Sequence, residues 1–288
     1  MPSRRIAIAG IAGVVVVVIA ALGVAKLIPG SQMQEIKFDM GHDIVATAKA
    51  SGVPRFNTRN VDGLISYGVT AVPAAIPARY TRPGFEVVWQ PIFAFTMYAD
   101  EHRDAARPVE SVDLQLDKKF ETDAQAQAFV EQTIAQFRKG RWQRYYNPTW
   151  DALLSGRSSF LDQKGDVTSP AMTIDPGYKI EPADWVALVT GGATWRWVGD
   201  GVLAQLTVDA DRGIGNAAPT YRASLTFDLL DVKLKQDADN GAAERKKYDA
   251  MGKNSTADYE KSKIDRLAVL KVIEANALKR GDQVLAPH

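Results

Sequence analysis

The chain contains no cysteine. It therefore forms no disulfide bond, has no thiol for catalysis and carries no lipid on a cysteine. Its folded part has to be stabilised by a hydrophobic core, and 288 residues are enough to build one. Charge of one sign is also lacking, because 35 lysines and arginines balance 34 aspartates and glutamates. Without a sustained basic patch, the sequence does not predict binding to nucleic acid.

Catalytic signatures are missing as well. The sequence has no H-E-x-x-H, G-x-S-x-G, S-x-x-K, P-loop or G-x-G-x-x-G motif, and it has only three histidines. These absences favour a protein that is not an enzyme, and no residue pattern indicates a cofactor.

The best enzymatic candidate is the segment DEHRD at residues 100–104. If the preceding strand continued through it, Asp100, His102 and Asp104 would share one face. Two carboxylates and an imidazole there could hold a divalent metal ion, which leaves open a membrane-tethered, metal-dependent hydrolase. The other interpretation is a hairpin loop whose charges face water. We favour that loop, because no second cluster completes a metal site.

What the sequence does have is a long apolar run, and it lies at the N-terminus. Residues 6–25 contain no charge and follow Arg4 and Arg5. A membrane-spanning helix needs about 20 apolar residues, whereas the apolar part of a secretion signal has about 7–15. The run therefore predicts a permanent single-pass anchor. The alternative is a signal cleaved after Ala25.

The flanking charges predict the orientation of this anchor. The arginines before the span favour a cytoplasmic N-terminus, so the rest of the chain is expected in the periplasm of a bacterium, attached to the inner membrane. The predicted organisation is a cytoplasmic tail and transmembrane helix over residues 1–30, a connector over 31–37 and a periplasmic domain over 38–288.

The first half of the predicted domain favours an α+β fold of mainly antiparallel sheet with flanking helices. Residues 85–98 and 111–117 are strand candidates, joined as a hairpin around the charged loop 99–110. Pro91 has no N–H to donate, so it predicts an edge position or a bulge.

An amphipathic helix is predicted after this hairpin. Thr122 and Gln125 have the spacing of a capping box, and Gly140 is expected to end the helix. Residues 141–146 then indicate another strand. The helix would turn one apolar stripe toward the core, formed by Ala126, Phe129, Val130, Ile134 and Phe137.

In the second half, Asp200-Gly201 predicts a two-residue hairpin turn. The register places Trp197 opposite Ala204 and Trp195 opposite Leu206, so the apolar side chains share one face. This arrangement favours burial of both tryptophans over a sugar-stacking platform.

A third strand is predicted over 221–229 and a helix over 240–280, broken near residues 252–254. Two lobes, 38–165 and 166–288, and a single continuous sheet fit these elements equally well.

The segment RWQRYYNPTW contains the candidate binding site. Its large aromatic and arginine side chains are the types that dominate protein interfaces, although they could instead cap the core. The candidate residues are Arg141, Trp142, Arg144, Tyr145, Tyr146 and Trp150.

Together these observations predict a membrane-anchored module that binds another protein. One specific form is an immunity protein that neutralises a secreted toxin, and another is a scaffolding subunit of an envelope complex. The alternatives are the metal-dependent hydrolase described above and a module that binds cell-wall glycans.

We expect the mature protein to retain residues 6–25, because their apolar length suits a membrane span. N-terminal sequencing should begin before Ile6, and the protein should stay with the membrane fraction after osmotic shock. A mature chain that starts at Lys26 and is released as a soluble protein would contradict the anchor.

Overall fold

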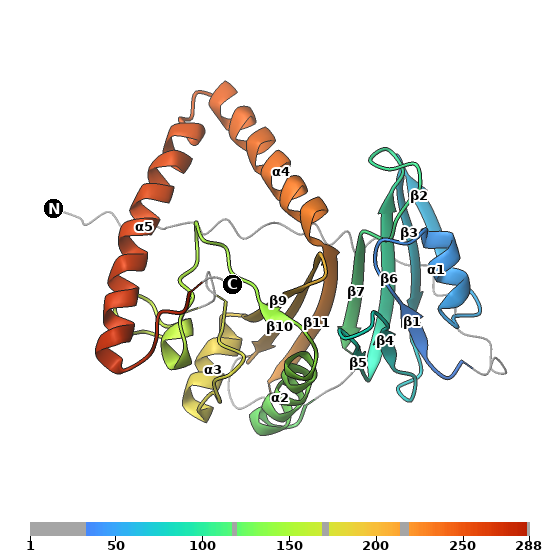
Figure 1. Ribbon diagram of the computed structural model, residues 1–288, viewed down its shortest axis with the longest axis horizontal. Helices are drawn as coiled ribbons and strands as arrows, with labels where there is room; N and C mark the ends of the chain where they lie inside the picture. The colour runs from blue at the N-terminus through green and yellow to red at the C-terminus, as the bar shows by residue number, and fades with distance from the viewer. Residues whose placement is uncertain (1–32, 117–119, 169–172, 214–218, 287–288) are drawn as a thin grey trace.

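The computed structural model describes residues 33–116, 120–168, 173–213 and 219–286 (Figure 1). The predicted anchor, residues 1–30, lies outside these described residues. Within them, no helix combines the length and the apolar character that crossing a membrane requires.

The predicted α+β class is confirmed in this described part, which has five α-helices, an eight-stranded antiparallel sheet and a three-stranded sheet. The first half contributes β1 (Ile36–Phe38), α1 (Ile44–Ala50), β2 (Asn57–Val61), β3 (Leu64–Thr70), β4 (Ala78–Tyr80), β5 (Val87–Trp89), β6 (Ile92–Asp100), β7 (Ser111–Leu116), α2 (Asp123–Lys139), β8 (Gln143–Arg144) and a 3-10 turn, η1 (Gly156–Phe160). The second half contributes α3 (Pro182–Thr190), β9 (Ala193–Gly199), β10 (Val202–Asp211), β11 (Thr220–Leu229), α4 (Leu230–Ala250) and α5 (Ser255–Arg280).

One sheet runs through both halves of the chain. Its strand order is β2-β3-β6-β7-β11-β10-β9-β8, and β7 pairs with β11 across more than a hundred residues of sequence. The smaller sheet has the order β1-β4-β5. Its first strand begins at Ile36, within the range 31–37 expected to be a connector, because Ile36 is fully buried and pairs with Ala78 of β4.

The prediction of one strand over 85–98 was wrong. The strand breaks at Pro91, which cannot donate to a ladder, so β5 joins the small sheet and β6 joins the large one. The predicted hairpin between β6 and β7 is confirmed, with a register irregularity between Ile92 and Ala94.

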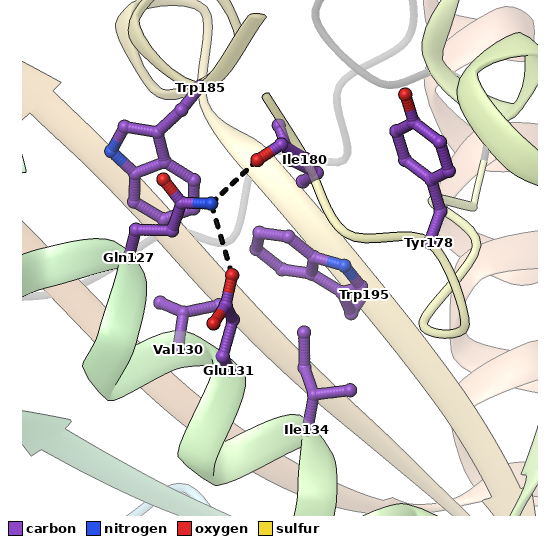
Figure 2. A pocket seen from close by; sticks show the side chains of 8 residues that line it. All are labelled: Gln127, Val130, Glu131, Ile134, Tyr178, Ile180, Trp185 and Trp195. Carbon is purple, nitrogen blue, oxygen red and sulfur yellow. Dashed lines mark hydrogen bonds between the residues drawn. The ribbon is translucent and has the colours of Figure 1, made fainter. Parts of the chain in front are cut away.

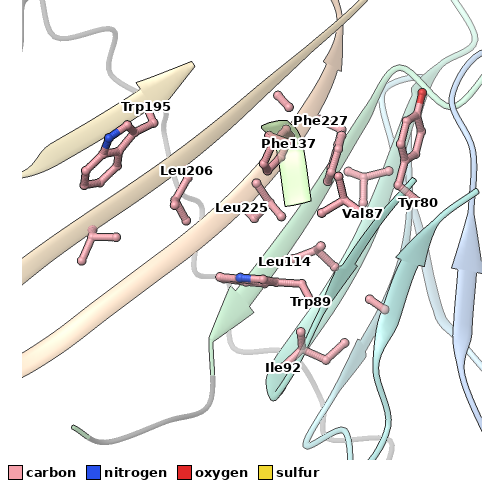
Figure 3. Close-up of a cluster of buried hydrophobic side chains, with 14 of the residues drawn as sticks. Tyr80, Val87, Trp89, Ile92, Leu114, Phe137, Trp195, Leu206, Leu225 and Phe227 are labelled. Carbon is pink, nitrogen blue, oxygen red and sulfur yellow. The ribbon is translucent and has the colours of Figure 1, made fainter. Parts of the chain in front are cut away.

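The predicted tryptophan hairpin is confirmed residue by residue. Trp197 pairs with Ala204 and Trp195 with Leu206, on either side of the Asp200-Gly201 turn. The two indoles are only 2% and 1% exposed. Both tryptophans are therefore core residues, and Figure 3 shows Trp195 beside Leu206.

Helix α2 supplies the layer that covers these tryptophans. The Phe137 ring stacks on Trp197 with centroids 3.9 Å apart, and the whole predicted stripe is buried. Thr122 caps the helix by accepting a hydrogen bond from the Gln125 N–H. The capping box is incomplete, because the Gln125 side chain accepts from the Glu121 N–H instead. Gly140 ends the helix in an extended conformation, where the left-handed geometry typical of this position was expected.

Among the described residues, the small sheet and two helices cover one face of the large sheet. The small sheet packs on it through Phe38, whose ring lies 5.5 Å from Phe95 of β6 and 5.3 Å from Phe227 of β11. Helices α2 and α3 cover the part formed by β9 and β10 (Figure 1). The opposite face carries mainly polar side chains, among them Asp113, Arg196 and Thr226.

The last two helices leave this body. Helix α4 continues directly from β11, and α5 returns along the edge of the molecule, so that the pair diverges from a turn at 251–254 (Figure 1). This break confirms the one predicted near 252–254. Helix α4 has no buried side chain in 21 residues, whereas α5 is anchored in its second half by Leu270, Ile273 and Ala277. We call these two helices the arm.

A partly buried network ties the helices of the body to the sheet. The Trp185 indole N–H of α3 donates to the Tyr221 hydroxyl of β11 at 3.1 Å, and that hydroxyl donates to Asp123 at the start of α2. Arg212 also donates to Asp123, at 2.8 Å. Burial and the hydrogen bond to Asp123 raise the pKa of Tyr221 to about 12.

We expect this network to make stability fall at alkaline pH. An unfolded tyrosine loses its proton near pH ~10, whereas folded Tyr221 keeps it to about 12, so the unfolded state binds fewer protons in between. The free energy of unfolding of the wild type should therefore drop with rising pH in this window, by on the order of 2 kcal/mol. In Tyr221→Phe the drop should be smaller.

Urea unfolding between pH ~8 and ~11.5 measures these slopes. Tyr67→Phe is the matched control, because Tyr67 is half-buried and stands apart from this network. Equal slopes for Tyr221→Phe and the wild type would show that Tyr221 does not titrate as its surroundings indicate.

Candidate functional site

The predicted metal group is not assembled. Strand β6 ends at Asp100, whose carboxylate accepts the backbone N–H groups of His102 and Arg103 at 3.0 and 3.3 Å. These bonds turn the chain, so the alternation that would place three ligands on one face is lost. Asp104 accepts from the Ala106 N–H instead. Within the described residues, no group of three or more histidine, aspartate or glutamate side chains is arranged to hold a metal ion.

The six residues proposed for partner binding divide into two groups. Arg141 and Trp142 serve the body of the domain. The Trp142 indole is 8% exposed and donates to the Phe85 carbonyl at 3.1 Å. The Arg141 guanidinium donates to the Pro83 carbonyl at 2.8 Å and lies 4.7 Å from the centre of the Phe85 ring. Trp142 therefore closes the core, whereas Arg141 is held against Pro83 and Phe85 at the surface and stays exposed.

Arg144 is also structural. Its guanidinium donates to the carbonyl of Leu154 at 2.6 Å and to that of Thr173. Burial lowers the pKa of Arg144 to about 10. This side chain holds two loop segments onto β8 and is not presented to a partner.

Tyr145, Tyr146 and Trp150 form the other group, and all three remain partly exposed. They follow β8, in a segment folded back by the carboxylate of Asp151, which accepts the Asn147 N–H at 2.7 Å. The segment runs from the sheet, where Tyr145 lies, to the arm, where Trp150 lies.

Helix α5 fixes the position of Trp150. Arg266 donates two hydrogen bonds to the Trp150 carbonyl, at 2.8 and 2.7 Å. The Trp150 ring lies 5.9 Å from the Tyr259 ring, centre to centre. The other helix of the arm also contacts Tyr259, because the Arg245 guanidinium of α4 lies 4.1 Å from the centre of the Tyr259 ring. The tyrosine is therefore in contact with both Trp150 and α4.

Tyr145 lies where the sheet faces the arm. Its N–H donates to the Arg196 carbonyl of β9 at 3.0 Å. Burial raises the pKa of Tyr145, and the carboxylates of Asp151 and of Asp237 on α4 raise it further, while Arg196 lowers it. The phenol therefore lies within electrostatic range of both the sheet and the arm. We refer to Tyr145, Trp150 and Tyr259 together as the aromatic surface.

A pocket of ≈ 340 Å³ adjoins this segment, where residues 146–153 meet α5 and the C-terminal residues 284–285. Its size lies at the lower end of the range for ligand sites. Its lining combines apolar side chains with a polar rim: Leu153, Leu267, Leu270, Val284 and Leu285 with Tyr146, Lys271 and Glu274.

A second cavity lies between α2 and the tryptophan hairpin, and Figure 2 shows Trp195 among the side chains that line it. Its volume is only ≈ 10 Å³, about the space of a single water molecule. Trp195 and Trp197 are therefore not available for stacking on a sugar.

Tyr259 and Arg266 were not among the predicted site residues. More than a hundred residues separate them from Trp150, so no local spacing connects the two segments. One local signal did exist, because Tyr259 is a lone aromatic in a charged stretch of helix.

We expect the purified full chain to contain no stoichiometric zinc or manganese, and His102→Ala to leave its metal content unchanged. The reason is that Asp100 and Asp104 already accept backbone N–H groups. Elemental analysis by mass spectrometry measures this. Stoichiometric metal that disappears in His102→Ala would restore the metal-site hypothesis.

The chain was compared with protein-family models, with curated proteins and with solved structures, and none of them matches it. No relative therefore supplies a function for the aromatic surface or for the arm. What this surface does has to be argued from the side chains described above.

Proposed function

We propose that this protein is a non-enzymatic module that binds another protein through the aromatic surface and the arm. In this proposal, residues 6–25 hold it at the bacterial inner membrane, with the cytoplasm on the N-terminal side and the folded domain in the periplasm. The observation that carries the proposal is α4, a helix of 21 residues without a buried side chain.

A helix of this kind gains little from packing within its own chain. Most helical stability in proteins comes from burial of an apolar face, and α4 buries none. Its support within the described residues includes the partly exposed pairs Lys233–Asp237 and Lys235–Asp239, which contribute only a few tenths of a kcal/mol each, and the contact of Arg245 with the Tyr259 ring. Such a helix is well suited to gain its contacts from a partner.

The aromatic surface has the composition of an interaction hot spot. Tyrosine, tryptophan and arginine are the residues that most often dominate binding energy, and here two tyrosines and a tryptophan lie beside Arg245 and Arg196. They remain partly exposed although they are held in place by contacts with the sheet and with α5. Binding would therefore require little ordering of these side chains.

Two narrower forms of this proposal differ in the partner. An immunity protein would bind a secreted toxin, whereas a scaffolding subunit would bind a resident protein of the envelope. The identity of the captured protein separates them, as does the presence of a toxin gene beside the gene of this protein.

The test is affinity capture of the full chain from its own envelope after cross-linking, followed by mass spectrometry. We expect Trp150→Ala combined with Tyr259→Ala to reduce recovery of the partner at least tenfold. This corresponds to the loss of one interface anchor, about 1.4 kcal/mol or more.

Phe93→Ala is the matched control, because Phe93 is an aromatic residue that is 42% exposed and lies in β6, away from the arm. It should recover the partner as well as the wild type does. Equal recovery by the double variant and by Phe93→Ala would place the binding surface elsewhere.

A further inference from the structure

Helix α5 has a second apolar side that the described fold leaves exposed. Its inner side packs on the body through Leu270, Ile273 and Ala277. On its outer side, Ile264, Leu267 and Leu278 are 68%, 48% and 61% exposed. Figure 1 places α5 at the outer edge of the molecule.

The outer residues follow a coiled-coil repeat. Positions 264, 267, 271, 274 and 278 are separated alternately by three and four residues, the spacing that keeps one seam along a helix facing a second helix. The neighbouring positions Ala268 and Ala275 are small and exposed. These small side chains would allow a second helix to approach closely. We call positions 264, 267, 271, 274 and 278 the seam.

Two seam positions carry opposite charges. Lys271 is exposed, Glu274 is half-buried, and neither forms an ion pair within the described part of the chain. The ion pairs made by α5 lie earlier in the helix, at Lys261–Asp265 and Lys263–Glu260.

We infer that the seam binds the seam of a second copy of this chain, with the two α5 helices antiparallel. In this register, Leu267 of each copy lies against Leu278 of the other, and Lys271 of each lies against Glu274 of the other. Every contact occurs twice, as a two-fold interface requires. The two Lys271–Glu274 layers lie at the centre, with a leucine layer on each side.

The charges of Lys271 and Glu274 favour antiparallel over parallel α5 helices. Parallel helices in register would place Lys271 against Lys271 and Glu274 against Glu274, and like charges facing each other are destabilising. The antiparallel register pairs every charge. Polar layers of this kind fix the register of a coiled coil, so the pairing is specific although it is short.

The second helix would also close the pocket beside α5. Leu267, Lys271 and Glu274 form part of its wall, so a helix laid on the seam covers the pocket from outside. The aromatic surface lies on a different side of α5, where Tyr259 and Arg266 contact Trp150. Self-association therefore leaves the aromatic surface open for its partner, and this inference stands without the proposed function.

The absence of cysteine allows a direct test in the full chain. Leu267→Cys and Leu278→Cys variants are mixed and treated with a mild oxidant. We expect a disulfide-linked dimer in the mixture, in at least tenfold greater yield than with either variant alone. Lys247→Cys, on an exposed position of α4, is the control and should give no dimer with either variant.

Charge reversal then tests the register. Lys271→Glu and Glu274→Lys should each lower the yield of cross-linked dimer at least tenfold, because each creates like-charged layers, and the double reversal should restore it. These residues have exposed or half-exposed side chains, and thermal unfolding checks that each variant is folded.

Three results would overturn the inference: a yield that the single reversals leave unchanged, a dimer formed more readily by Lys271→Cys alone than by the mixture, or cross-links from the seam to a different protein only. The second result would indicate parallel helices. The third would assign the seam to another partner.

Discussion

The antiparallel pairing of β7 with β11 is the contact on which the rest of the structure depends. It joins strands of the first half to strands of the second half in one eight-stranded sheet. Because the sheet is continuous, the rings of Phe38 and Tyr80 from the small sheet can reach Phe227 on β11. The same sheet positions Trp197 beneath Phe137 of α2. A chain without disulfides depends chiefly on this main core for its stability.

Because the small sheet and two helices cover one face of the large sheet, a binding surface has to lie elsewhere on the described part of the molecule. The covered face is filled by large apolar side chains, and the cavity left there has room for about one water molecule. The polar face and the two helices that follow β11 remain accessible. The partly exposed aromatic side chains beside α4 and α5 are the part of this surface on which the proposed function rests.

The arm combines two different surfaces on one helix. The side of α5 that bears Tyr259 and Arg266 contacts Trp150, whereas the side with Ile264, Leu267 and Leu278 faces outward. A module with both surfaces could hold its partner in a two-fold assembly, since neither surface obstructs the other. Helix α5 can serve in this way because its second half is anchored in a small core of its own, formed by Leu154 and Ala152 with Leu270, Ile273 and Ala277.

The sequence by itself determined the elements whose signals are local. The register of the Trp195–Trp197 hairpin follows from Asp200-Gly201 and strand alternation, and α2 follows from its cap and its apolar stripe. Tertiary structure alone decided the rest. It split the apolar run at Pro91 between two sheets, turned the chain at Asp100 so that Asp100, His102 and Asp104 do not share one strand face, and divided the aromatic segment into buried Trp142 and partly exposed Trp150. Composition cannot distinguish these outcomes, because each depends on which distant strand or helix supplies the neighbouring surface.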